Sequence, residues 1–200
     1  MLSTALTGRR WTDKNVCPTK VMIETSRLKL VPCELAHFEA LIDDESRLAP
    51  MLQVELAPEW LGFEARAAMR PASDYLKAHP SALGWWTYLF IHKPDNTLIG
   101  LGGFKGEVDA EGMVEIGYEI APSYRRRGLA SEASEGMIDY AFAQPAIKRV
   151  DAHTLPERNA STGVLEKVGM KFLGAVHDPG DGEVWHWSLT REQYRPTDTH

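Results

Sequence analysis

One short segment of the sequence has the residue types of an anion-binding loop. Residues 124–131 read YRRRGLAS, and the residues after them recur with helical periodicity. Small side chains at Gly128 and Ala130 would let backbone N–H groups approach a ligand closely, and the positive end of the helix dipole favours phosphate oxygens. The three arginines add to this polarity, so the segment predicts a phosphate-binding site. An exposed basic turn before an ordinary helix is the alternative, because short glycine patterns also occur by chance.

Acid–base chemistry could come from the segment just before this loop. Residues 113–121 alternate apolar and polar positions, which places Glu115 and Glu119 on one face of a strand. A carboxylate there could accept a proton as a general base. His153, in a later segment, could relay a proton because imidazoles titrate near neutral pH. The alternatives are a solvated polar face of a sheet for the two acids, and an ordinary strand residue for the histidine.

Other chemistries lack the patterns that they require. The seven histidines and two cysteines form neither an HExxH motif nor paired cysteines, so no metal site is predicted. No GxGxxG, Walker or GxSxG motif occurs, which argues against dinucleotide-binding and serine-hydrolase functions. Two cysteines are too few for a disulfide framework, and no apolar run approaches the roughly 20 residues that span a bilayer. The sequence therefore predicts a cytoplasmic protein.

The periodicity of the chain predicts the elements that would position these residues. Three consecutive strands are predicted over residues 85–121, and two helices come after them. One helix follows the arginine loop and ends at Pro145, and the other runs from Asn159 to Gly169. Because a helix connects the strand over residues 113–121 to the strand over residues 147–155, this pair is expected to run parallel. The predicted strands cover residues 24–32, 85–92, 97–104, 113–121, 147–155, 170–177 and 183–189. This pattern predicts a mixed α/β (α+β) fold in which helices flank a mostly antiparallel sheet of about seven strands.

Residues 46–84 are the least regular part of the sequence. They contain four prolines, which predict an irregular flap with helical turns at 63–69 and 73–79. Aromatic residues in or beside the flap could shape a pocket, or belong to the core; they are Trp60, Trp85, Trp86 and Tyr88. Acidic residues in it could attract a cationic substrate, or be ordinary surface charges; they are Glu55, Glu59 and Glu64.

Length and charge restrict the class of protein. The 200 residues, 44% of them hydrophobic, fit one globular domain. We expect this domain over residues 21–192, between a flexible N-terminal tail (1–20) and a C-terminal tail (193–200). The 22 basic and 28 acidic side chains give a net charge of −6, which argues against nucleic acid or an anionic membrane as the main partner.

Several of these segments together resemble the GNAT acyltransferases. The Arg125-x-x-Gly128-x-Ala130 pattern is similar to the family's acetyl-CoA diphosphate loop, and residues 115–122 (EIGYEIAP) resemble its fourth strand. Residues 159–169 (NASTGVLEKVG) resemble the last helix of the RimJ/RimL-like branch, which acetylates protein N-termini. The ETSRL of residues 24–28 and the Trp-His-Trp of residues 185–187 fit the same branch. The resemblance thus covers residues 24 to 189 and implies a GNAT fold.

The resemblance also implies a reaction and its residues. A primary amine would attack the thioester of acetyl-CoA directly. Glu115 would be the general base, directly or through a water, with Glu119 the next candidate, and Ser161 would protonate the departing thiolate. The alternative for Ser161 is an early-helix serine that bonds to nearby backbone. The implied cosubstrate-binding residues are Tyr118, Glu119, Ile120, Arg125, Arg126, Arg127, Gly128, Leu129, Ala130, Ser131 and Asn159.

Two positions depart from the family pattern. Arg158 stands where many relatives have an asparagine, so Asn159 could contact the cosubstrate differently or only cap the helix. Leu165 stands where other branches have a tyrosine that acts as the acid, so Ser161 or a water would have to protonate the thiolate here.

The predicted function is therefore an acetyl-CoA-dependent N-acetyltransferase. Its partners would be acetyl-CoA and an amine acceptor, either a protein N-terminus or a small amine, and not a metal, nucleic acid or membrane. The chain would be a monomer or homodimer. The alternative is an acyl-CoA-binding sensor without turnover, because such a loop constrains binding more than chemistry.

Overall fold

A computed structural model describes residues 22–106, 108–180 and 182–196. The predicted tail over residues 1–20 and residues 197–200 lie outside this part. The helices are α1 (Leu35–Asp43), α2 (Leu48–Leu52), α3 (Phe63–Ala78), α4 (Leu129–Ala143) and α5 (Ala160–Lys167). The strands are β1 (Ile23–Glu24), β2 (Leu28–Pro32), β3 (Glu55–Leu56), β4 (Thr87–His92), β5 (Thr97–Phe104), β6 (Met113–Ile120), β7 (Arg149–Thr154), β8 (Lys171–Asp178) and β9 (Gly182–Thr190).

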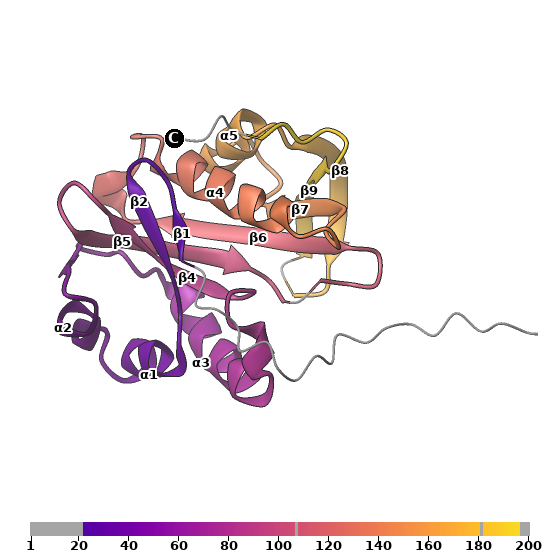
Figure 1. The fold of residues 1–200 in the computed structure, drawn as a ribbon. Helices are drawn as coiled ribbons and strands as arrows, with labels where there is room; N and C mark the ends of the chain where they lie inside the picture. Colours follow the sequence, from indigo (N-terminus) through magenta and orange to yellow (C-terminus); the bar gives the residue numbers. More distant parts are fainter. Residues whose placement is uncertain (1–21, 107, 181, 197–200) are drawn as a thin grey trace, which may run out of the picture.

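The strands form one mixed sheet in the order β1-β2-β4-β5-β6-β7-β9-β8, and β3 pairs with β5. Only the β6–β7 and β3–β5 pairs are parallel among the described strands. Figure 1 shows α1, α2 and α3 on one side of the sheet and α4 and α5 on the other. The predicted fold is confirmed, and six of the seven predicted strands are present as single strands. The strand predicted over residues 24–32 is divided into β1 and β2, which pair antiparallel, and β3 is a two-residue addition.

The parallel pair β6–β7 separates partway along its length. In the described structure the two strands are paired from Met113–Arg149 to Glu115–Asp151. Beyond this point β6 continues beside β5 alone, and β7 continues beside β9 alone. The sheet therefore opens between the two strands, and the edge of β6 after Glu115 can offer its backbone groups to another partner.

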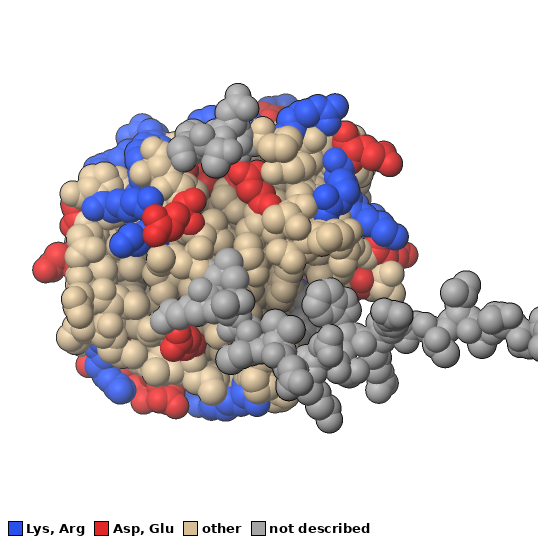
Figure 2. All heavy atoms as spheres, in the orientation of Figure 1, with Lys and Arg blue, Asp and Glu red and all other residues tan. Residues whose placement is uncertain are grey.

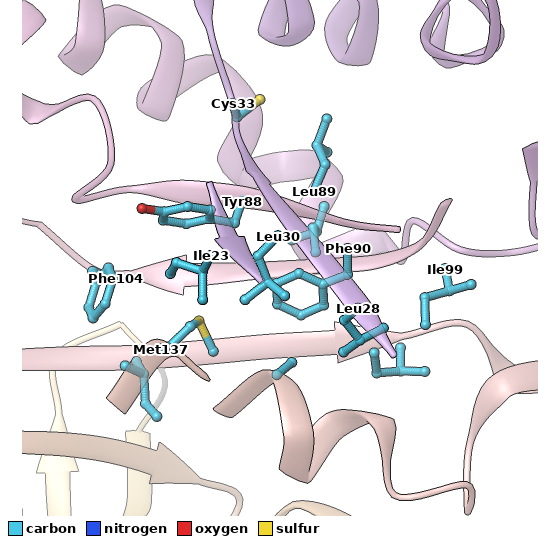
Figure 3. Close-up of a cluster of buried hydrophobic side chains, with 14 of the residues drawn as sticks. Ile23, Leu28, Leu30, Cys33, Tyr88, Leu89, Phe90, Ile99, Phe104 and Met137 are labelled. Carbon is cyan, nitrogen blue, oxygen red and sulfur yellow. The ribbon is translucent and has the colours of Figure 1, made fainter. Parts of the chain in front are cut away.

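The core lies between the sheet and the helices on its two sides. Figure 3 shows its central side chains, including Leu30, Phe90 and Met137, which are fully buried. Tyr88 belongs to this core, and its hydroxyl donates a hydrogen bond to the Gly84 carbonyl (2.9 Å). Trp60 is also buried, so these two aromatics are core residues. Trp85 and Trp86 are half-buried and pack against the same core.

The predicted irregular flap was wrong for its longest part. α3 is one continuous helix of 16 residues that runs through Pro71. Proline inside a helix costs about 3 kcal/mol, which is why the sequence favoured two short turns. Met69, Ala72 and Leu76 form a buried stripe at helical spacing on α3. Burial of this stripe offsets the cost of the proline.

The described residues after β9 contact the domain. Tyr194 packs on Phe142 of α4, with ring centroids 4.6 Å apart, and its hydroxyl donates to Asp139 Oδ1 (2.7 Å). This part of the predicted C-terminal tail is therefore anchored to α4.

Candidate active site

The arginine loop makes a tight turn into α4. Gly128 is the N-cap residue of this 15-residue helix and has a left-handed backbone conformation (φ 78°). Arg126 is also left-handed (φ 59°). Glycine adopts this conformation without strain, and the first N–H groups of a helix have no partner within it. The loop thus presents unpaired donors at the positive end of the α4 dipole.

A cation from the other end of the sequence is attached to this turn. Arg27 Nη1 donates to the Arg127 carbonyl (3.0 Å), and Arg27 Nε pairs with Glu132 Oε2 (2.7 Å). Glu132 is buried and also accepts hydrogen bonds from Thr25 Oγ1 and the Arg27 backbone N–H, both at 2.6 Å. Burial acts to raise the pKa of Glu132, but the hydrogen bonds from Thr25 and Arg27 hold it below its ordinary value. Glu132 therefore fixes Arg27 beside the loop.

A second cation approaches the same place. A Cβ atom added to Gly128 would lie 3.5 Å from Arg27 Nη2 and 3.8 Å from Lys167 Nζ, the latter from the end of α5. Two cations close to one point repel each other unless an anion lies between them. The loop arginines differ from these two. Arg125 Nε donates to the Ile120 carbonyl (2.9 Å), and the Arg127 guanidinium lies over the Tyr124 ring (4.7 Å).

A cavity of about 330 Å³ lies beside the part of β6 that is no longer paired with β7, and the starts of α4 and α5 form the rest of its wall. It brings together seven of the residues predicted from the sequence, and Ala160 and Val164 complete its lining. The seven are Tyr118, Glu119, Ile120, Arg125, Ala130, Asn159 and Ser161. Arg126, Arg127 and Gly128 lie in the turn before α4, while Leu129 and Ser131 are buried in its first turn.

Tyr118 and Ser161 connect the two walls of this cavity. The Tyr118 hydroxyl donates to the Ser161 carbonyl (3.3 Å), and burial raises the pKa of Tyr118 above its ordinary value. Asn159 caps α5, since its Oδ1 accepts from the N–H groups of Ser161 (2.9 Å) and Thr162 (3.1 Å). The capping role considered for Asn159 is therefore present. The Ser161 hydroxyl takes no part in this cap.

Glu115 and Glu119 share a face of β6 but have different neighbours. Glu115 Oε1 lies 3.0 Å from His153 Nδ1 and 2.6 Å from Lys105 Nζ. Glu119 stands about 13 Å further along the strand, at roughly 3.3 Å per residue. Its carboxylate lies so close to Gly62, the N-cap residue of α3, that a Cβ there would overlap it. The structure thus groups Glu115 with His153 and places Glu119 at the positive end of α3.

Sequence reasoning gave no role to several residues near these groups. They come from distant parts of the chain and are Lys105 and Asp151, together with Arg27, Lys167 and His186, which were noted only as parts of motifs. The alternation of the last strand could have placed His186 on the face of His153, but only with the strand pairing known. Glu55 and Glu59 are exposed, and the side chain of Glu64 lies outside the described part.

The described residues contain neither a metal-ligand cluster nor a membrane-spanning helix. No group of three or more His, Cys, Asp or Glu side chains in this part is placed to hold a metal ion. No helix in it has the length and apolar character needed to cross a membrane.

Comparison with known proteins agrees with this geometry. Residues 27–171 match the family model described as acetyltransferase (GNAT) domain. YjdG of Bacillus subtilis, named an uncharacterized N-acetyltransferase, is 26% identical over 167 residues, which are 84% of this chain and 96% of YjdG.

Solved structures show the same fold. RimL, a ribosomal L7/L12 alpha-N-protein acetyltransferase in complex with coenzyme A, aligns with a TM-score of 0.61 at 18% identity over 87% of this chain and 100% of RimL. Ribosomal-protein-S5-alanine acetyltransferase from Vibrio fischeri gives 0.62 at 15% identity, over 88% of this chain and 100% of that one. With residues 27–171 matching its family model, the chain belongs to the GNAT acetyltransferases and is an acyltransferase.

Proposed function

We propose that this protein transfers the acetyl group of acetyl-CoA to a primary amine by direct attack on the thioester. The observation that carries the proposal is the opening between β6 and β7. The cavity beside this opening has Arg125 and the first turn of α4 in its lining, and the Glu115–His153 pair lies where the two strands part. An elongated cosubstrate with anionic and reactive ends matches this arrangement.

The anionic end of acetyl-CoA would bind at the start of α4. Backbone N–H groups of residues 126–131 would contact the diphosphate, and Arg27 and Lys167 would neutralise its charge. The pantetheine arm would pair with the edge of β6 at residues 118–120, where the ladder to β7 has ended. A backbone N–H at this edge would polarise the thioester carbonyl.

The sulfur end of the cosubstrate would meet Ser161. The backbone N–H and carbonyl of Ser161 are engaged with Asn159 and Tyr118, which fixes the residue at the cavity wall. Its hydroxyl is then placed to protonate the departing thiolate. The proton of the incoming amine would leave on the side of the sheet that carries Glu115.

The acceptor that we propose is the α-amino group of a protein N-terminus, as in the RimJ/RimL-like branch. The sequence pattern of α5 supports this, and the names of the RimL and S5-alanine enzymes describe that acceptor class. On the face drawn in Figure 2, acidic and basic side chains lie near one another, without a continuous patch of either sign. This mixed surface suits a peptide better than a polyanion.

A turnover assay with an amine panel tests the proposal. The protein is incubated with acetyl-CoA and peptides that have a free N-terminus, with the same peptides blocked at the N-terminus as the matched control, and with a polyamine and an aminoglycoside. We expect thiol release with the free peptides only. Release with the small amines alone would contradict the acceptor class. Calorimetric binding of acetyl-CoA without turnover on any amine would instead support the sensor alternative.

A further inference from the structure

A row of polar side chains crosses three strands beside the cavity. In the strand register Glu115 of β6 is opposite Asp151 of β7, and Asp151 is opposite Ser188 of β9. His153 is opposite His186 one step further along the same face. Because side chains alternate between faces, all five point to one side of the sheet.

The contacts within this row join the two histidines to two carboxylates. His153 Nδ1 lies 3.0 Å from Glu115 Oε1, and the His153 ring stacks on His186 with centroids 4.9 Å apart and planes 20° from parallel. His186 Nε2 lies 2.9 Å from Asp151 Oδ2. Asp151 is 3% exposed and also accepts a hydrogen bond from Ser188 Oγ (2.7 Å). Such order in a buried polar row indicates a fixed orientation for each ring.

We propose that Nε2 of His153, rather than the Glu115 carboxylate, takes the proton from the acceptor amine. This inference rests on the proposed function. A carboxylate at Nδ1 stabilises the tautomer with the proton on Nδ1, which leaves Nε2 as the basic atom. Glu115 Oε1 already faces two groups, His153 and Lys105, so it serves as a positioning residue.

The position of His153 fits this role. β7 leaves β6 after Asp151, and His153 is the second residue beyond that point. It lies on the face that carries Glu115 and Glu119, at the start of the opening. Its side chain is 27% exposed, against 4% for that of Asp151. A substrate amine can therefore reach His153 but not the buried carboxylate of Asp151.

Several charged groups surround His153. Glu115 of β6 places a carboxylate at its Nδ1, and the Lys105 ammonium contacts the same carboxylate. His186 of β9 stacks on the His153 ring.

The remaining charged groups near His153 are Asp151 and Arg149 of β7, and they pair with other groups rather than with His153. Asp151 is shared between His186 Nε2 and Arg149, whose Nε lies 3.1 Å from Asp151 Oδ1. We infer that His186, held by Asp151, fixes the tilt of the His153 ring and does not itself exchange a proton with the substrate.

The reaction balances with one proton released. The substrate ammonium gives a proton to His153 Nε2, and the amine nitrogen then bonds to the thioester carbon while the carbonyl π pair moves to oxygen. When the C–O double bond re-forms, the C–S bond breaks and its electron pair stays on sulfur. The second nitrogen proton leaves to the thiolate through the Ser161 hydroxyl. The products are the amide and the CoA thiol, and the imidazolium passes its proton to water.

The test measures kcat/KM against pH with a free N-terminal peptide and acetyl-CoA. For the wild type we expect an acidic limb that Glu115→Gln keeps and His153→Gln loses. His153→Gln should lower kcat/KM about 100-fold or more and remove that limb, without changing the calorimetric Kd for acetyl-CoA. His153→Ala should recover part of its rate with added imidazole. His177→Gln, exposed on β8, is the matched control.

Each outcome decides the proposal. Wild-type turnover with a His153→Gln rate within about three-fold and an unchanged limb overturns the role of His153 and leaves the proposed function standing. An acidic limb that disappears in Glu115→Gln and remains in His153→Gln returns the base to the carboxylate. If the wild type binds acetyl-CoA but acetylates no amine, both proposals fail together. Rescue by imidazole in a variant with unchanged acetyl-CoA binding supports His153, because a merely structural role would give no rescue.

Discussion

Replacing Gly128 by alanine separates the folding role of the arginine loop from its binding role. The residue has φ 78°, a conformation that costs an L-residue about 1–2 kcal/mol. The added Cβ would meet no atom closer than 3.5 Å, so strain rather than collision sets the cost. For a domain of this size that corresponds to a fall in Tm of roughly 2–8 °C. The folded protein should therefore survive the change.

Binding should suffer more than stability in the Gly128→Ala variant. The new methyl would occupy the point between Arg27 Nη2 and Lys167 Nζ, where we place a phosphate oxygen. Loss of one hydrogen bond to a charged group costs about 1.5–3 kcal/mol, or roughly 10- to 150-fold in the Kd for acetyl-CoA.

Calorimetric titration of acetyl-CoA, beside a thermal melt, measures both effects. Gly163→Ala is the matched control, because Gly163 is exposed on α5 with no atom within 4 Å of an added Cβ. It should gain about 0.5–1 kcal/mol of stability and keep its affinity. A folded Gly128→Ala variant with a Kd within about three-fold of the wild type would refute the placement of the diphosphate.

Three further substitutions test the contacts around the cavity. Glu132→Gln should lower the unfolding free energy at pH 7 by about 1.5–3 kcal/mol; because the pKa of folded Glu132 is lowered, this difference should shrink as the pH falls below about 4, as denaturant titrations at both pH values would show. Tyr118→Phe removes the bond to the Ser161 carbonyl and should cost about 1 kcal/mol in the same assay; no loss would mean that the two walls are not tied there. Gly62→Ala should cost only about 0.5–1.5 kcal/mol, because the overlapped atoms are the carboxylate end of the flexible Glu119 side chain, which can turn aside. Adding Glu119→Ala should restore much of this cost, and strictly additive costs would argue against the contact.

The elements that the sequence predicted well are those decided by neighbouring residues. Alternation and the Asp-Pro-Gly turn predicted the last hairpin over 170–177 and 183–189, and the structure has β8 over Lys171–Asp178 and β9 over Gly182–Thr190. Asn159 was predicted as a helix cap from its type and place, and its Oδ1 accepts hydrogen bonds from the backbone N–H groups of Ser161 and Thr162. Turn and cap signals act within a few residues, so they can be read locally.

Features that depend on distant contacts were not predicted. The continuity of α3 through Pro71 depends on the burial of its stripe, which no local propensity contains. The end of the β6–β7 pairing after Glu115 depends on the register of two strands joined by α4. Arg27 and Lys167 meet at Gly128 from opposite ends of the chain. The spacing of residues along the sequence does not predict which distant residues meet in the fold.

The two acids on β6 show how the fold divides one strand between two substrates. Periodicity placed Glu115 and Glu119 on the same face, but β7 accompanies the first and the start of α3 meets the second. The alternate residues Val114, Ile116 and Ile120 are buried on the other face, where α4 packs on β6. Since the cosubstrate loop belongs to α4 and the Glu115–His153 pair faces the opposite way, acetyl-CoA and the amine should approach the thioester carbon from different faces of the sheet. The opening between β6 and β7 is what lets them meet, because a fully paired sheet would keep the two faces apart.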